Sequence, residues 1–93
     1  MNTKFLGNKI EAYPFVNIEW NDVEGDAGWS NTKDLNKEPL PVCVSKGYLA
    51  SQKNGVTRVF TDYIKTKDKD TFDTIGNTTI IPTSLIVSIK KIN

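Results

Sequence analysis

The chain contains no histidine, and its 93 residues include only one cysteine. Histidine is the commonest general base and the commonest transition-metal ligand near neutral pH, so its absence removes both kinds of chemistry together. A single cysteine excludes a disulfide within the chain and a cysteine zinc site in a monomer. No pair of acid–base groups stands out either. We therefore predict a protein that is not an enzyme and needs no metal or cofactor.

Long apolar runs and an excess of one charge are also missing. No run approaches the ~18 residues of a membrane-spanning helix, and residues 1–10 lack the apolar centre of a signal peptide. The sequence thus predicts no membrane contact and a cytoplasmic location. The 12 basic and 11 acidic residues give a formal net charge of +1. Because binding to duplex DNA depends on a positive field, we expect no duplex DNA partner.

The length of the chain fits one domain, residues 1–93, with a partly loose N-terminal segment over residues 1–13. A chain of this size buries somewhat over ~60% of the surface of its unfolded state, so its core is modest. Only 38% of the residues are hydrophobic. Small domains of this kind often gain stability by association, and we expect a homo-oligomer.

Five short segments predict β-strands. The clearest is Phe15–Trp20, where apolar and polar residues alternate with a period of two. Between the second and third segments, Asn54-Gly55 favours a two-residue type I′ hairpin turn. Within the second, Gly47 predicts a bulge or a close approach of backbone or ligand. In the last, Leu85, Val87 and Ile89 are expected on one face. The four later segments are residues 42–51, 56–64, 78–81 and 85–89.

The segment between the first two strands holds both tryptophans, Trp20 and Trp29, separated by three acids, two glycines and no base. Ser30 is expected to cap a short helical turn, which Pro39 and Pro41 stop. Two interpretations of the tryptophans stay open. Either both fill the core and hold the loop against it, or one presents its ring to a nucleobase. The two can also hold together, with Trp20 buried and Trp29 at a rim.

The order of these elements predicts an all-β fold. Five short strands, one long insertion after the first and a one-turn element before the last are typical of a small SH3-like or Sm-like barrel. The expected fold is a five-stranded barrel of this kind with a Trp-bracketed loop and a short helical turn. Such a half-open barrel leaves strand edges, which can pair with another copy.

An ordered set of short motifs runs through residues 16–92: Trp20-x-Asp22, Gly28-Trp29, Val44-Ser45-x-Gly47-Tyr48, residues 56–61, Ile81-Pro82 and Ile86-x-x-Ile89. In order and spacing the set resembles a widespread group of small, mostly uncharacterised bacteriophage proteins. The resemblance implies a phage or prophage protein that acts in the bacterial cytoplasm and has no catalytic residues. By analogy of context it also implies an anti-defence role, since some small phage proteins sequester nucleotide-derived immune signals.

Seven residues are candidates for binding a ligand. Three belong to the Trp loop, three to the second strand and one to the third: Trp20, Asp22, Trp29, Ser45, Lys46, Tyr48 and Arg58. A glycine flanked by a hydroxyl, a cation and an aromatic ring suits a phosphate and a base. Arg58 is the only arginine, the residue type that binds phosphate in bidentate fashion. Structural interpretations stay open beside these: a half-buried Tyr48, a Lys46 that extends along apolar surface, and a surface ion pair for Arg58.

The acids of the Trp loop suggest a calcium site only in part. Asp22, Glu24 and Asp26 fit the first, third and fifth places of a calcium loop. Ala27 and Lys33 stand where that loop requires glycine and glutamate. We therefore predict no calcium and expect Asp22 to accept a hydrogen bond from backbone or from a ligand amine.

Cys43 lies between two valines, Val42 and Val44, and is expected to be a small core hydrophobe. A catalytic thiol needs an activating base, and the chain offers no histidine for that purpose.

The functional prediction is a non-enzymatic phage protein that binds a small nucleotide-type ligand and sequesters a host immune signal. Its pocket is expected between the Trp loop and the second strand, with walls completed by a second copy. Two alternatives stay open. One is a protein-interaction module that inhibits a host protein through an exposed edge or the acidic loop. The other is an Sm-like binder of RNA or single-stranded DNA, which the low net charge disfavours.

Overall fold

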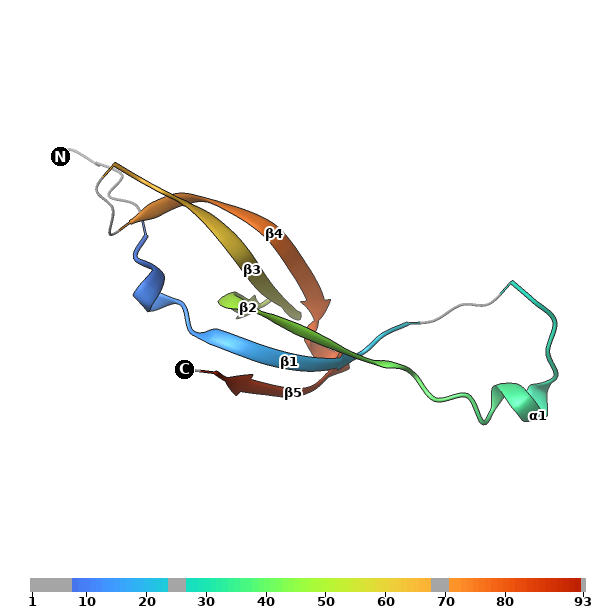
Figure 1. Ribbon diagram of the computed structural model, residues 1–93. Coiled ribbons are helices and arrows are strands. Elements are labelled where there is room, and N and C mark those ends of the chain that lie inside the picture. The colour runs from blue at the N-terminus through green and yellow to red at the C-terminus, as the bar shows by residue number, and fades with distance from the viewer. Residues whose placement is uncertain (1–7, 24–26, 68–70, 93) are drawn as a thin grey trace.

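The computed structural model describes residues 8–23, 27–67 and 71–92, which form one antiparallel sheet of five strands (Figure 1). The order across the sheet is β4-β3-β2-β1-β5. The prediction of an all-β fold is confirmed, while the sheet has β4 and β5 as its edges and is not closed into a barrel. The strands are β1 (Phe15–Asn21), β2 (Val42–Lys53), β3 (Val56–Lys65), β4 (Phe72–Pro82) and β5 (Ile86–Lys91). The short helices are η1 (Ile10–Ala12), α1 (Thr32–Leu35) and η2 (Thr83–Leu85).

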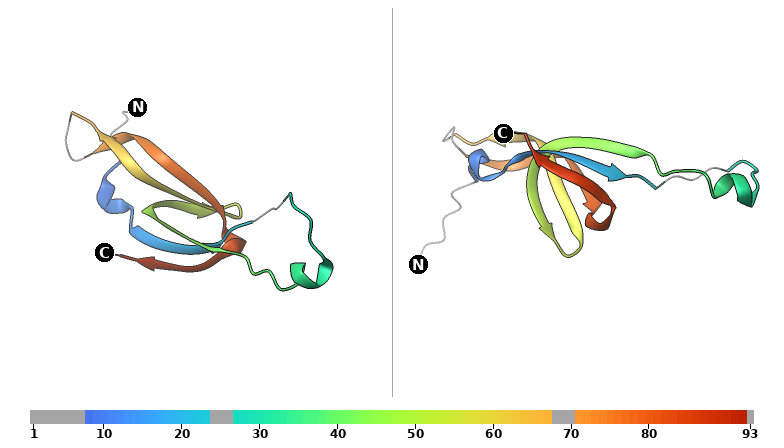
Figure 2. Two further views of the ribbon diagram at one scale, coloured as in Figure 1. Left: turned by 45° about the vertical axis from the view of Figure 1, so that its right-hand side comes forward. Right: turned by 90° about the horizontal axis from the view of Figure 1, so that it is seen from below.

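Strand β2 belongs to both halves of the sheet and curves between them (Figure 2). Its first part, up to Tyr48, pairs with β1, and from Tyr48 onward it pairs with β3, with a register shift just beyond. The crossing needs Gly47, because a Cβ atom there would lie 2.9 Å from the carbonyl oxygen of Phe60. The predicted close approach of backbone at Gly47 is therefore correct.

The turn between β2 and β3 has the conformation that its sequence predicts. Asn54 and Gly55 have φ angles of 56° and 78°, both in the left-handed region that a type I′ turn requires. The carbonyl of Gly55 also accepts a hydrogen bond from the Thr83 amide at 3.0 Å. The Thr83 and Thr57 hydroxyls lie 2.9 Å apart. These bonds fix η2, and with it the start of β5, to the β2–β3 hairpin.

The main core lies on one face of the curved sheet. Val16 and Ile18 of β1, Val59 of β3 and Ile81 of β4 are buried there. Their burial follows from the period-2 alternation of strands, which sends every second side chain to the same face. Three partly buried side chains pack against these four: Trp20, Leu49 and Ile86.

A second apolar layer, made of aromatic rings, lies on the opposite face. Tyr48 stacks on Phe60 with ring centres 5.4 Å apart and meets Phe15 edge-on at 4.9 Å. Tyr13 contacts both Phe60 and Phe72 at 5.6 Å. Edge-to-face and offset contacts are the arrangements that aromatic quadrupoles favour. Of the aromatic residues that the structure describes, six take part in this cluster and give a small domain a second apolar layer: Tyr13, Phe15, Tyr48, Phe60, Tyr63 and Phe72.

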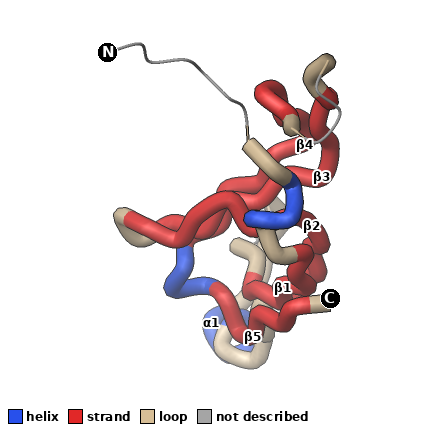
Figure 3. The backbone as a smooth tube through the Cα atoms, turned by 90° about the vertical axis from the view of Figure 1, so that its left-hand side faces the viewer, coloured by secondary structure: helices blue, strands red, loops and turns tan. Residues whose placement is uncertain are grey.

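The segment before β1 packs on the aromatic layer through Tyr13, and Figure 3 shows its backbone beside the sheet. Asn8 and Phe72 exchange two backbone hydrogen bonds of 2.9 and 2.8 Å, and η1 then leads to Tyr13. The sequence suggests a partly loose segment over residues 1–13. Of these residues the structure describes 8–13, which are attached to the start of β4.

Two predicted strands differ from the observed ones. β4 begins six residues before the predicted start at Thr78, and it runs through Gly76 and Asn77. Asn77 has a φ angle of 53°, and its side-chain amide donates to Asp62 across the hairpin. These turn-forming residue types hide the strand in the sequence. Pairing with nearly the whole of β3 outweighs their weak β propensity.

The predicted apolar face of the last strand is also wrong. Leu85 belongs to η2, and Val87 is 58% exposed. Instead Ile86 is opposite Trp20 and Ile89 is opposite Ile18. These two residues of β5 are three positions apart, whereas a regular strand repeats every two, because the register between β1 and β5 shifts between the two pairs.

Between β1 and β2, the described residues 22–23 and 27–41, which we call the arm, leave the sheet as an extended segment (Figures 1 and 2). All residues from 27 to 40 are exposed. The radius of gyration is 18.2 Å, whereas a compact chain of this length has about 12 Å. The arm contains α1 as predicted, but its N-cap is Asn31 and not Ser30: the Asn31 side chain accepts from the Asp34 amide at 2.8 Å.

Among the described residues, no helix has the length and apolar character needed to cross a membrane.

Candidate functional site

The seven predicted binding residues are distributed over separate parts of the molecule. Trp20, Asp22 and Ser45 come together where the arm leaves the sheet. Trp29 lies in the arm itself, and the other three lie on β2 and β3: Lys46, Tyr48 and Arg58. The predicted single pocket between the Trp loop and the second strand is thus not formed by all seven within one chain.

Trp20 is anchored to β2 through its one polar atom. The indole Nε1 donates to the Ser45 hydroxyl at 3.0 Å, and the ring packs against the main core. In the register of the two strands, Ser45 is opposite Ile18 and Trp20 is opposite Cys43. Trp20 and Ser45 are therefore diagonal neighbours on the core face, a distance that long side chains can span.

Asp22 continues this group at the end of β1. Its backbone amide donates to the Pro41 carbonyl at 2.9 Å, which closes the base of the arm. Burial, together with the charge and the hydrogen bonding of the Asp22 carboxylate, raises the pKa of the half-buried Cys43 thiol. The thiol therefore stays protonated near neutral pH, the form that is a poor nucleophile. The Asp22 carboxylate thus acts on this thiol, a partner that the sequence did not suggest.

Trp29 has an environment opposite to that of Trp20. Its side chain is fully exposed, at 103% of the reference surface. Three other apolar side chains of the arm are at least half exposed: Val23, Leu35 and Leu40. Of the two interpretations offered by the sequence, the core interpretation suits Trp20 and does not suit Trp29.

The exposed apolar surface continues from the arm onto β2. Val42 and Val44 are both more than half exposed on the face opposite the core. We call these two residues the root patch. Glu19 is opposite Val44 in β1, and Lys46 follows two residues along β2 on the same face. The root patch is thus apolar with a charged border.

Tyr48 is half-buried, as the structural interpretation of the sequence expects, and Arg58 lies elsewhere, on β3. Arg58 has Ser51 and Ile80 as its cross-strand neighbours, and Ile80 is 61% exposed. Tyr48 is held within the aromatic cluster, stacked on Phe60. Phosphate binding by Arg58 stays a prediction.

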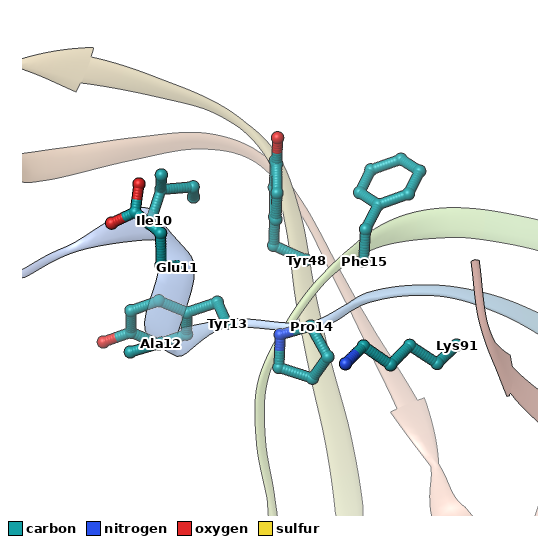
Figure 4. A pocket seen from close by; sticks show the side chains of 8 residues that line it. All are labelled: Ile10, Glu11, Ala12, Tyr13, Pro14, Phe15, Tyr48 and Lys91. Carbon is teal, nitrogen blue, oxygen red and sulfur yellow. The ribbon is translucent and has the colours of Figure 1, made fainter. Parts of the chain in front are cut away.

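One open pocket of about 560 Å³ lies between η1 and the end of the sheet (Figure 4). Of the predicted binding residues only Tyr48 lines it. Its wall is fixed by two backbone bonds, Leu49 to Pro14 at 2.8 Å and Ile92 to Phe15 at 2.7 Å. The other lining residues belong to segments 10–15 and 91. These segments meet through long-range strand pairing, so no local sequence pattern predicts the pocket. The lining is Ile10, Glu11, Ala12, Tyr13, Pro14, Phe15, Tyr48 and Lys91.

The described residues contain no cluster of three or more metal-ligating side chains. Of the three acids of the partial calcium motif, Asp22 is described, while Glu24 and Asp26 lie outside the described residues.

Comparison with protein-family models, curated proteins and solved structures finds no match. The function therefore has to be argued from the geometry of the chain itself.

Proposed function

We propose that this chain is a non-enzymatic protein-interaction module, in which the arm, with residues 27–41 as its docking part, binds to a protein surface. One observation carries the proposal: the arm projects from the sheet with Trp29 fully exposed. Tryptophan is among the residue types that contribute most to binding when they enter a partner's pocket.

The free energy available from docking is large for so small a protein. Burying an aromatic side chain removes roughly 150–250 Å² from water. At about 25 cal/mol per Å², Trp29 alone represents roughly 4–6 kcal/mol before the costs of association. Large exposed apolar surface on a soluble protein often has a function, and the arm exposes Leu35 and Leu40 as well as Trp29.

The polar residues of the arm fit the same role. The arm also exposes side chains with charges of both signs: Lys33, Asp34, Lys37 and Glu38. Interfaces commonly have an apolar centre and a polar rim of this kind. The Asn31 cap and the bond between Asp22 and Pro41 keep the arm ordered at its helix and at its base.

The proposal includes an SH3-like architecture for the sheet. Three features support it. β2 is shared between a β5-β1-β2 half and a β2-β3-β4 half, the strands are antiparallel throughout, and the short helix η2 precedes the last strand. In this arrangement the arm is the long connection between the first two strands.

The resemblance of the sequence to small bacteriophage proteins supports a setting for this module. There the protein acts in the cytoplasm of a bacterial host, and binding inhibits a host protein, such as one used in defence. This part of the proposal depends on sequence motifs alone.

A capture experiment in the bacterial host tests the role of the arm. Affinity-tagged wild-type protein, Trp29→Ala and Leu35→Ser would be expressed, and bound proteins identified by mass spectrometry. Ile64→Ser is the matched control, because Leu35 and Ile64 are both 63% exposed and only Leu35 lies in the arm. A stoichiometric partner should be retained by wild type and the control and lost by both arm variants. The same partners on all four proteins would refute docking by the arm.

The pocket beside η1 supports a second candidate function, the binding of a small nucleotide-type ligand. Its volume of about 560 Å³ lies within the 300–1,000 Å³ range of ligand sites. It combines aromatic side chains, Phe15 and Tyr48, with the cationic Lys91, which suits a base and a phosphate. With a host immune signal as ligand, the activity would be sequestration.

A thermal-melt screen tests this second function, using cyclic dinucleotides, cyclic ADP-ribose isomers and linear nucleotides. A ligand at 100 times its dissociation constant adds about 2.7 kcal/mol, which should raise the melting temperature by roughly 10 °C or more. Lys91→Ala should abolish the shift, and Lys90→Ala, next to it on β5 and outside the pocket lining, should retain it. No shift with any ligand would exclude this function for these ligand classes.

A further inference from the structure

We infer that the surface on which the arm docks is a second copy of this chain, so that two chains exchange arms about a two-fold axis. The arm of each chain then covers the root patch of the other. This inference rests on the proposed function, in which the arm docks on a protein surface, and it makes that surface a second copy of the chain in place of a host protein.

Each chain carries both halves of the required contact. The arm supplies Trp29, Leu35 and Leu40, and the sheet supplies the root patch of Val42 and Val44, all at least half exposed. The arm does not cover its own root patch. The bond between Asp22 and Pro41 continues the β1–β2 pairing into the arm and directs it away from the sheet.

A dimer with two-fold symmetry can form both contacts between arm and root patch at once. In an isologous dimer, a contact of residue i with residue j implies the contact of j with i. One distance, from the root patch to the apolar centre of the arm, is the same in both chains. A two-fold axis perpendicular to this line, displaced to one side of its midpoint so that the two arms lie side by side, brings the arm of each chain to the root patch of the other. The arms then lie antiparallel, and both contacts form together.

The size of the contact suits a stable dimer. A standard interface uses about 20–30 residues a side, with about 800 Å² buried on each partner. The exposed arm from Ala27 to Leu40 has fourteen residues. The face around the root patch adds residues of β1 and β2 to each side, including Asn17, Glu19 and Lys46. The two together reach about 20 residues a side, the lower end of that range.

The charges of the chain allow self-association. The formal net charge is +1, so that two copies repel each other little. At the root patch, Glu19 and Lys46 offer both signs. The arm offers both signs as well, with Lys33 and Asp34 on α1. Each charged side chain of the border can therefore find an opposite charge on the other copy.

Sedimentation equilibrium of the purified protein tests the inference. Wild type should be a dimer at micromolar concentration. Trp29→Ala and Val44→Ser, which change the arm and the root patch in turn, should each raise the dissociation constant by roughly 30-fold or more. Ile64→Ser, equally exposed to solvent but on β3, should leave it unchanged.

A crosslinking experiment covers the case in which a variant fails to fold. In a Cys43→Ser background, Lys33→Cys in the arm and Lys46→Cys beside the root patch would be made in chains of different mass and mixed. A short bis-maleimide should join the two chains to each other. In the control experiment Lys53→Cys, at the far end of β2, replaces Lys46→Cys. This pair of chains should not be crosslinked.

Each result decides between the proposals. A wild-type monomer up to about 100 µM overturns the arm exchange, and if an arm-dependent host partner is still captured, the proposed function stands. A dimer that withstands both variants also overturns it and indicates pairing through the edges β4 or β5. With neither a dimer nor an arm-dependent partner, the inference and the proposed function both fail.

Discussion

The indole Nε1 of Trp20 donates a hydrogen bond to the Ser45 hydroxyl at 3.0 Å and so joins β1 to β2 at the base of the arm. The pair lies on the core face, beside the Cys43 thiol and the Asp22 carboxylate. It fixes the position from which the arm leaves the sheet. The same four residues, predicted in part as a binding site, thus have a structural role.

Ser45→Ala should lower stability because it leaves the half-buried indole N–H without its partner. A hydrogen bond of this kind contributes about 0.5–1.5 kcal/mol, equivalent to a decrease in melting temperature of roughly 4–8 °C for 1 kcal/mol in a domain this small. Thermal denaturation followed by circular dichroism measures it. Ser84→Ala, at an exposed position in η2, is the control and should change the melting temperature little. Equal melting temperatures for the two variants would show that the bond contributes nothing.

Gly47→Ala should destabilise the protein because the new Cβ would lie 2.9 Å from the carbonyl oxygen of Phe60. This contact is with the backbone of the next strand, so β2 and β3 must separate locally. We expect a cost of about 1–3 kcal/mol, as for other overpacked positions. Gly76→Ala is the matched control in the same sheet, since its nearest neighbour would be 3.9 Å away. Urea denaturation of both variants measures the difference, and equal midpoints would contradict the close approach.

Local sequence patterns predicted the elements whose determinants are local. The alternation in residues 15–20 predicted β1, because a period of two is typical of a strand. Asn54-Gly55 predicted the turn, because both residue types accept the left-handed conformation of a type I′ turn. The extent of β4 could not be predicted in this way. Gly76 and Asn77 favour a turn locally, and only the pairing with β3 keeps them in a strand. The attachment of Asn8 to Phe72 joins residues 64 positions apart, and no local pattern reports it.

The candidate site was predictable only as a set of residue types. The sequence selected Trp20 and Ser45, but their contact depends on the register of β1 with β2 and on the rotamer of an indole. Trp20 and Trp29 carry the same sequence signal, a tryptophan beside an acidic loop. One has core neighbours and the other has none, because the chain leaves the sheet between them.

The reactivity of Cys43 should depend on Asp22. Because burial and the Asp22 carboxylate raise the thiol pKa, the rate of alkylation by iodoacetamide should rise at a higher pH than for a free cysteine. Asp22→Asn removes the negative charge and should move this rise to lower pH. Asp34→Asn, in the arm helix, is the control and should leave the profile unchanged. Identical profiles for wild type and Asp22→Asn would refute the coupling.

The same raised pKa has a consequence for stability. A group that binds its proton more tightly in the folded state contributes stability that is fully present below its unfolded pKa, about 8.5 for cysteine. That contribution is lost as the pH rises through the higher folded value. Cys43→Ser should therefore flatten the decline of melting temperature in alkaline solution. An unchanged decline would assign it to other groups.

The two tryptophans should differ most clearly when each is replaced. Trp20→Ala removes a ring packed against the core and should cost about 3 kcal/mol, the lower end of the range for large aromatic residues because Trp20 is only partly buried. Trp29→Ala removes a side chain that is fully exposed within the chain, so its cost in dilute solution should stay within about 0.5 kcal/mol. Urea denaturation at low protein concentration measures both. If Trp29→Ala were as destabilising as Trp20→Ala under these conditions, the arm would be folded against its own sheet, and its surface would not be free for a partner.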